Sequence, residues 1–197
     1  MNVMMEKSDV YTNHFQKITN NDFQMRQFEL KDALAYFQLY NNPLIKKYIP
    51  GDMIPRDIRA SAAQIKSLFL QGRSYPYWAV VRSDNDTLIG SCGFVSSEVY
   101  HKRVELAYDL HPDYWGNGIM HKTLVACVKY AFENMHVQRL EAVTLQDNLQ
   151  SIKSLLRLGM LHEGTLRNFK FFKGKMVNVE SFSMTQQDYM KIYQEIM

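Results

Sequence analysis

The chain has 197 residues, of which 46% are hydrophobic, 13% aromatic and 22% charged, and its 23 basic and 20 acidic side chains give a formal net charge of +3. This composition fits one globular domain: the aromatic content excludes a disordered chain, two cysteines exclude a disulfide scaffold, and the mild charge without basic blocks argues against a nucleic-acid-binding protein. No apolar run approaches the roughly 18 residues that span a bilayer, and residues 1–22 contain no apolar signal segment, so we expect a cytoplasmic protein.

The first part of the chain predicts an extension, a strand and three helices. Residues 1–21 show no sustained periodicity, and we expect them to form an N-terminal extension to a domain that covers 22–197. The run 23–28 predicts a short strand. Apolar residues at helical spacing then predict helices at 29–40, 44–48 and 55–70.

The second part predicts strands separated by two helices. Apolar runs on either side of a polar turn predict a hairpin of strands at 77–82 and 88–95. Alternating apolar and polar side chains predict a strand at 103–110. The remaining expected elements are a helix from 120 to 135, a strand at 140–145, a helix at 151–158 and a hairpin of strands at 165–172 and 177–184. Helices and strands that mix in this way predict an α/β domain on a mixed sheet.

The most informative segment joins the strand that ends at Leu110 to the helix that starts at Met120, and residues 114–118 within it read YWGNG. Glycines at positions 116 and 118 let the backbone approach a ligand, and the N–H groups at a helix N-terminus bind anions, so we expect a phosphate or pyrophosphate here. A strand-to-helix turn that needs glycine only for its geometry is the alternative. The third glycine of the dinucleotide fingerprint is missing and no GxxxxGK[ST] motif occurs, so neither a dehydrogenase nor a P-loop NTPase is indicated.

Three segments in this order resemble the GCN5-related N-acetyltransferase (GNAT) superfamily, and within it the RimJ/RimL type of ribosomal-protein N-terminal acetyltransferase. They are the strand 104–110, the loop 114–120 and the segment 147–151, which reads DNLQS. The resemblance covers about residues 22–185. The acetyl-CoA loop of the family reads Gln/Arg-x-x-Gly-x-Gly/Ala, whereas the first position here is Asp113. This departure puts one side-chain contact to phosphate in doubt but leaves the backbone cradle.

The resemblance implies the GNAT fold, a mixed, mostly antiparallel sheet that is flanked by helices and splays between the strands 103–110 and 140–145. The pantetheine arm of acetyl-CoA would lie in that gap, and its pyrophosphate would rest on the glycine loop. The cofactor-binding residues implied in this way are Tyr108, Asp109, Leu110, Trp115, Gly116, Asn117, Gly118, Ile119, Met120, Asn148 and Ser151. Asn148 and Ser151 are also cap-type residues before an apolar helical pattern, so helix capping is the alternative role for both.

Acetyl transfer to an amine needs a base for the attacking amine and an acid for the leaving thiolate. The resemblance implies Ser151 as the acid and Glu163 as the base. Glu105, on the polar face of the strand that leads to the glycine loop, is a second candidate base. A paired surface carboxylate is the alternative role for each glutamate. An α-amine has a pKa of about 7.7–8.0 and needs less help than a lysine amine at about 10.4.

We therefore expect an acetyl-CoA-dependent N-acetyltransferase that transfers acetyl directly to a primary amine, with a protein N-terminal α-amine as the first choice of acceptor. Two alternatives stay open: an acetyltransferase of a small amine (a polyamine, an aminoglycoside or an amino acid derivative) and a non-catalytic acyl-CoA-binding module. A strongly acidic acceptor pocket would favour a polycationic amine, and a long open groove would favour a peptide.

Metal sites, membranes and nucleic acid are not expected. The six histidines show no i,i+4 pair and no cluster with cysteine. His121, in the first turn of the helix after the glycine loop, is instead a candidate contact to phosphate. A homodimer is left open. For four tyrosines two roles stay open, packing in the core or lining an acceptor groove: Tyr40, Tyr48, Tyr75 and Tyr77.

Overall fold

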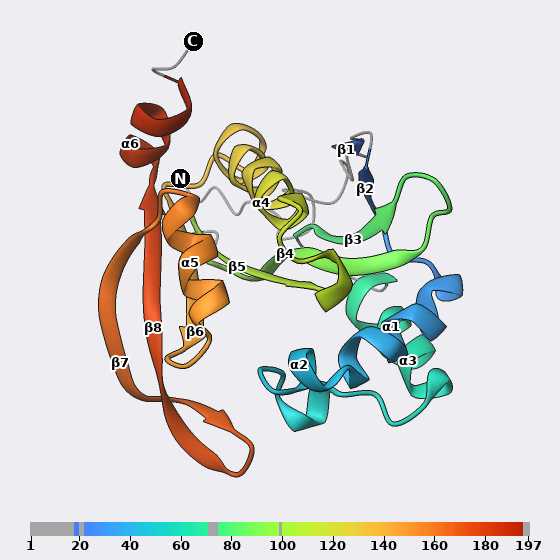
Figure 1. Ribbon diagram of the computed structural model, residues 1–197. Coiled ribbons are helices and arrows are strands. Elements are labelled where there is room, and N and C mark those ends of the chain that lie inside the picture. Colours follow the sequence, from blue (N-terminus) through green and yellow to red (C-terminus); the bar gives the residue numbers. More distant parts are fainter. Residues whose placement is uncertain (1–17, 20–21, 71–74, 99, 195–197) are drawn as a thin grey trace, which may run out of the picture.

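The structure is a computed structural model that describes residues 18–19, 22–70, 75–98 and 100–194. Within these residues eight strands form one sheet in the order β1-β2-β3-β4-β5-β6-β8-β7 (Figure 1). Neighbouring strands are antiparallel except β5 and β6, which are parallel. The strands are β1 (Ile18–Thr19), β2 (Phe23–Arg26), β3 (Tyr77–Arg82), β4 (Leu88–Glu98), β5 (Arg103–Leu110), β6 (Arg139–Leu145), β7 (Leu161–Phe172) and β8 (Lys175–Thr185). The α/β class and the mixed, mostly antiparallel sheet are confirmed.

Helices cover both faces of this sheet, with α1 and α3 on one face and α4 and α5 on the other (Figure 1). The α-helices are α1 (Ala33–Asn41), α2 (Pro43–Lys46), α3 (Ile58–Ile65), α4 (Ile119–Lys129), α5 (Leu149–Arg157) and α6 (Gln186–Tyr189). The 3-10 turns are η1 (Leu30–Asp32), η2 (Gly51–Met53) and η4 (Pro112–Tyr114), and the π turns are η3 (Lys66–Leu70), η5 (Tyr130–Asn134) and η6 (Met190–Gln194). In the described residues no helix is both long and apolar enough to cross a membrane.

Two hydrophobic cores lie on the two faces of the sheet, and β3 contributes to both. Side chains alternate along a strand, so Trp78 and Val80 pack with α4, whereas Tyr77, Ala79 and Val81 pack with α1 and α3. All five side chains are at most 7% exposed. Full burial of one such side chain stabilises the fold by about 1.5–3 kcal/mol, so the centre of the sheet is a rigid base for the strands that follow.

The sheet splays between β5 and β6, as the resemblance implied. These strands pair only through residues 103–105 of β5 and 139–141 of β6. Beyond that point the two strands part, and their main-chain groups on the facing edges no longer pair with each other. The gap begins directly after Glu105 and widens toward Leu110, where the glycine loop follows.

The described elements match the predicted ones, and two of them begin at other residues than expected. The helix expected from residue 55 begins at Ile58, because the side chain of Asp57 caps it by accepting from the Ala60 N–H at 2.7 Å. The strand expected from 165 begins at Leu161, because a register shift between His162 and Gly164 lets the pairing with β8 continue past the glycine.

One described strand and one described α-helix were not predicted. β1 falls inside the segment expected to be an extension, and a two-residue strand is too short to show a period. Helix α6 starts with a capping box of Thr185 and Asp188, a signal that the sequence does carry. Residues 1–17 and 20–21 of the expected extension lie outside the described residues.

Candidate active site

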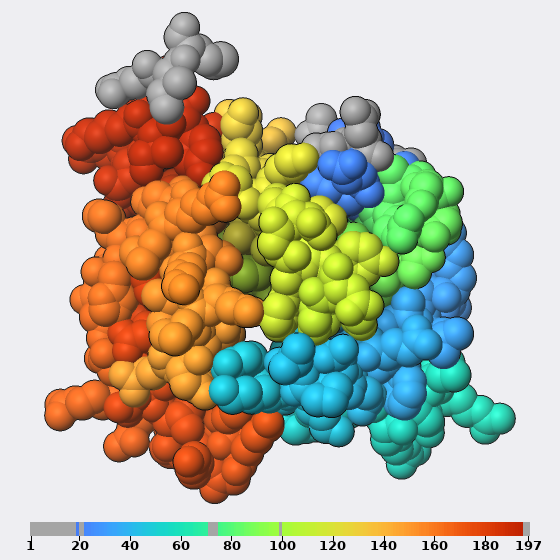
Figure 2. Space-filling model, in the orientation of Figure 1, coloured from blue at the N-terminus to red at the C-terminus, as the bar shows by residue number. Residues whose placement is uncertain are grey.

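One cleft of about 720 Å³ opens where β5 and β6 part. In Figure 2 the surface is hollowed between α5, in orange, and the glycine loop with the start of α4, in yellow-green. Every residue expected to bind the cofactor lines this cleft except Asn117. Of the three candidate catalytic residues, Ser151 and Glu105 line it and Glu163 does not.

The glycine loop presents open backbone to the cleft. Gly116 and Gly118 have φ values of +80° and +73°, which L side chains rarely adopt, and nothing lies within 4 Å of a Cβ built on either. Gly118 is the N-cap of α4 and supplies no side-chain cap, so the first N–H groups of this helix are available to a ligand. Trp115 fixes the loop to the end of β5, because its indole Nε1 donates to the Leu110 carbonyl at 2.7 Å.

Three basic side chains line the cleft beside this loop: His121 on α4, and Lys153 and Arg157 on α5. Burial and the charge of Arg157 lower the pKa of His121, and its buried Nδ1 has no hydrogen-bond partner among the described residues. Lys153 and Arg157 were not predicted as site residues, although their i,i+4 spacing on the polar side of an amphipathic helix places both on one face. The side chain of Asp113, where the family has Gln or Arg, is 80% exposed and does not line the cleft.

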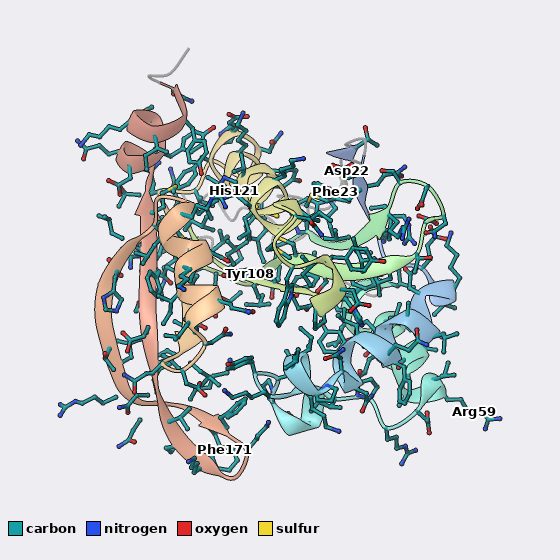
Figure 3. All side chains as sticks on the ribbon, viewed as in Figure 1. Asp22, Phe23, Arg59, Tyr108, His121 and Phe171 are labelled. Carbon is teal, nitrogen blue, oxygen red and sulfur yellow. The ribbon has the colours of Figure 1, made fainter. Side chains whose placement is uncertain are left out.

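Two hydroxyl groups meet in the middle of the cleft, where Figure 3 shows Tyr108 beside α5. The Tyr108 hydroxyl and Ser151 Oγ are 2.8 Å apart, and the same hydroxyl lies 3.2 Å from the Ser151 carbonyl. Burial raises the pKa of Tyr108, so this hydroxyl stays protonated at neutral pH. Asn148 caps α5, because its Oδ1 accepts from the Ser151 N–H at 3.3 Å. The capping alternative is therefore present for Asn148, while the Ser151 side chain faces Tyr108.

Glu105 stands at the start of the gap between β5 and β6. Burial raises the pKa of its carboxyl group, against the opposing effect of Lys170. Ser96 Oγ lies 3.4 Å from Glu105 Oε2, a long hydrogen bond that leaves the carboxylate largely unengaged. A carboxylate with a raised pKa is a better proton acceptor than an ordinary surface carboxylate.

Glu163 lies in β7 and is engaged by Arg139, the first residue of β6. Arg139 Nη1 donates to Glu163 Oε1 at 2.9 Å, and Nη2 also contacts Oε2. This guanidinium lowers the pKa of the carboxyl group. Glu163 is held at Arg139, where β6 begins, whereas Ser151 follows the residue at which β6 ends. The acid and the base that the resemblance implies therefore lie at opposite ends of this strand.

Asp109 holds the end of α1 against the sheet. Its Oδ2 accepts from the Tyr40 hydroxyl at 2.5 Å and from Ser91 Oγ at 2.7 Å. Its Oδ1 is buried and has no partner among the described residues. Burial raises the pKa of this carboxyl to about 6. Tyr40 and Tyr77 are core residues, which confirms the packing alternative for both, whereas Tyr48 lines the cleft.

A bridge crosses the cleft from the end of α1 to the β7–β8 hairpin; we call residues 43–50 the α2 bridge. Lys173, in the turn between β7 and β8, donates to the carbonyls of Lys46 and Lys47 at 3.0 and 3.1 Å. Lys47 Nζ pairs with Asp147 Oδ2 at 3.1 Å, and the Tyr48 hydroxyl donates to the Asp147 carbonyl at 3.3 Å. Figure 2 shows this segment, in cyan, meeting the orange C-terminal part of the surface.

Comparisons with known proteins agree with this architecture. The family model described as an acetyltransferase (GNAT) domain matches residues 22–161. The chain is 30% identical over 169 residues to an uncharacterized N-acetyltransferase, p20, of Bacillus licheniformis, which covers 84% of this chain and 93% of that protein. It is 23% identical over 167 residues to the spermidine N(1)-acetyltransferase of Escherichia coli, over 85% of this chain and 88% of that protein.

A solved structure of a ribosomal-protein-S5-alanine acetyltransferase from Vibrio fischeri superposes with a TM-score of 0.77 at 18% identity, over 88% of this chain and 98% of that chain. This likeness confirms the GNAT fold. Among the described residues no group of three or more His, Cys, Asp or Glu side chains is arranged to hold a metal ion.

Proposed function

Because the chain belongs to the GNAT acetyltransferase family and is therefore an acyltransferase, we propose that it transfers the acetyl group of acetyl-CoA directly to a primary amine, with the N-terminal α-amine of a protein as the acceptor. The observation that carries this proposal is one continuous cleft that joins the glycine loop, the Tyr108–Ser151 hydroxyl pair and Glu105. A RimJ/RimL-type role is supported by the similarity to the ribosomal protein uS5-alanine N-acetyltransferase of Escherichia coli, which is 24% identical over 181 residues.

The residues of the cleft fit acetyl-CoA, which would supply an activated acetyl group as a thioester. The open backbone at Gly116 and Gly118 and the uncapped start of α4 suit a pyrophosphate. His121, Lys153 and Arg157 add donors for phosphate oxygens beside them, in place of the family's Gln or Arg at position 113. The unpaired edges of β5 and β6 offer main-chain donors and acceptors to the amides of the pantetheine arm.

In the proposed reaction Glu105 takes the proton of the attacking amine, directly or through water, and the Tyr108–Ser151 pair returns a proton to the thiolate that leaves. Glu105 is preferred to Glu163 because it lines the cleft and has a raised pKa, whereas Glu163 is held by Arg139. Ser151 keeps its proposed role as acid, with the protonated Tyr108 hydroxyl behind it. An α-amine needs only modest help from such a base, because its pKa of about 8 leaves a neutral fraction near pH 7.

The charges that line the cleft support a peptide rather than a polycation as acceptor. The lining residues of the Asp, Glu, His, Lys and Arg types are Glu105, Asp109, His121, Lys153, Arg157 and Lys170. Only two of these are acidic, and the carboxylate of Asp109 is engaged by Tyr40 and Ser91. An acidic pocket of the kind that would hold spermidine or an aminoglycoside is therefore missing from the described lining.

Release of CoA from acetyl-CoA, measured against a panel of acceptors, tests the proposal. The panel contains peptides that begin with Ser, Ala or Met, the same peptides with a blocked α-amine, spermidine and an aminoglycoside. Turnover with the free peptides alone supports the proposed function. Turnover with small amines alone indicates an acetyltransferase of a small amine. Binding of acetyl-CoA without turnover of any acceptor indicates a non-catalytic acyl-CoA-binding module.

Three further expectations remain proposals: the boundary between the extension and the domain at residue 22, a cytoplasmic location and a homodimer. β7 is the edge strand of the described sheet and exposes apolar side chains, Leu161 at 60%, Phe169 at 56% and Phe171 at 67%. An exposed apolar edge strand is a surface on which a second copy can pair. Sedimentation of the purified protein measures the oligomeric state.

A further inference from the structure

The acceptor end of the cleft, between Glu105, the α2 bridge and the β7–β8 hairpin, is lined by two opposite charges; Lys173 and the Lys47–Asp147 pair belong to the hairpin and the bridge but do not line the cleft. The two lining charges are those of Glu105 and Lys170. The other side chains there are apolar or aromatic: Leu44, Ile45, Tyr48, Ile49, Pro50, Met53, Val95, Phe172 and Val179. Glu141 also influences the pKa of Glu105, but Arg139 and Arg103 hold its carboxylate at 2.7 and 3.5 Å.

An irregularity in β7 brings Lys170 to this place. In the sheet β7 lies three positions from β5. Its pairing with β8 slips between Leu166 and Lys170, and Asn168, inside the slip, has a left-handed φ of 48°. The Asn168 N–H donates to Asn178 Oδ1 at 2.9 Å, which holds the irregular backbone in position. Such bulges bend a strand and redirect side chains. The bent hairpin reaches toward α2 (Figure 1), and Lys170 lines the cleft with Glu105.

Both charges are available to a ligand. Lys170 is exposed, and its ammonium group forms no hydrogen bond or ion pair with any described residue. Its effect on Glu105 is a longer-range attraction rather than a contact. A ligand charge placed between the hairpin and β5 would meet an unengaged ammonium on one side and a largely unengaged carboxylate on the other.

We infer that Lys170 is a specificity-determining residue, which selects acceptors that carry an anionic group close to the reacting amine. The inference rests on the proposed function, in which the acceptor amine approaches Glu105. A carboxylate next to that amine is attracted by Lys170, whereas a second ammonium group, as in a polyamine, is repelled. The carboxylate can be an Asp or Glu side chain next to the N-terminus of a peptide, or the α-carboxylate of an amino acid.

Two matched pairs of acceptors distinguish a carboxylate in a peptide side chain from the α-carboxylate of an amino acid. The peptide pair shares one sequence and has Glu or Lys after an N-terminal Ser. The small-amine pair is phenylalanine and 2-phenylethylamine, which differ only by the carboxylate. CoA release gives kcat and KM for each acceptor with the wild-type protein, Lys170→Met and Lys170→Glu. Lys175→Met is the matched control, because Lys175 is also exposed on the hairpin but does not line the cleft.

The wild-type protein is expected to prefer the anionic member of whichever pair it acetylates by about tenfold in kcat/KM, mainly through KM. Lys170→Met removes this preference and Lys170→Glu reverses it, while Lys175→Met keeps it. An unchanged preference in Lys170→Met overturns the inference. Acetylation of the small amines alone overturns the peptide acceptor of the proposed function, and the preference within the small-amine pair then still tests Lys170.

Discussion

The buried carboxyl of Asp109 makes a quantitative prediction about stability and pH. Its pKa is about 6 in the folded protein and about 3.9 in an unfolded chain. Between these values the folded protein binds more protons than the unfolded chain, so the contribution of Asp109 to stability falls as pH rises from about 4 to 6 and is constant above that. The full difference is about 3 kcal/mol, at about 1.4 kcal/mol for each pKa unit. Between pH 5 and pH 7.5 the fall amounts to about 1.4 kcal/mol.

Asp109→Asn removes this titration, while its side-chain oxygen can still accept from Tyr40 and Ser91. Urea unfolding of the wild-type protein and the variant at pH 5 and pH 7.5 gives the free energy of unfolding of each. The difference between wild type and variant should change by about 1.4 kcal/mol, with the wild type relatively more stable at pH 5. Asp52→Asn, at an exposed residue of η2, is the control. A wild-type-minus-variant difference that is the same at both pH values would refute the reasoning.

Three further predictions concern the cleft. Glu105→Gln should lower kcat by about 10²–10⁴, as expected for loss of a general base, whereas Glu163→Gln should leave kcat within a few-fold of wild type; equal losses in steady-state assays would contradict the choice between them. Arg157→Gln should raise the Kd for acetyl-CoA by about tenfold in calorimetry, and the 90% exposed Arg56, changed to Gln, should not; an unchanged Kd for the Arg157 variant removes it from the phosphate site. Gly118→Ala should destabilise the protein by about 1–2 kcal/mol in urea, because the residue has a φ of +73°, and a neutral result would show that the loop can adopt another backbone conformation.

The parts of the fold that depend on local periodicity could be predicted from the sequence. Alternation along β5 and the amphipathic pattern of α4 each depend on neighbours a few residues away, and both elements are where they were expected. The splay between β5 and β6 is a tertiary feature, and it was reached only through the resemblance to a family. β1 has two residues and no period to detect, so its pairing with β2 depends on contacts that only the folded chain supplies.

The candidate site was predictable where the chain runs continuously through it, from Tyr108 to Met120, and less so where distant segments meet. Glu105 and Glu163 could not be ranked from the sequence, because their separation depends on the sheet order and on the slip at the start of β7. The sequence does not distinguish Lys170 from the neighbouring lysines 173 and 175 of the same hairpin. Its place in the cleft follows from the second slip and from Asn168, whose left-handed backbone no spacing rule predicts.

The parting of β5 and β6 also has a mechanical consequence. Three paired residues on each strand and the exposed ion pair and hydrogen bonds of the α2 bridge connect the half-sheet β1–β5 to the half-sheet β6–β8 along this seam. Exposed ion pairs add only about 0–1 kcal/mol each, so the α2 bridge adds little to the connection between the two half-sheets. A chain of amides that paired with both edges, as proposed for the pantetheine arm, would act as a missing strand and connect the two halves. Binding of the acetyl donor would then also stiffen the sheet between β5 and β6.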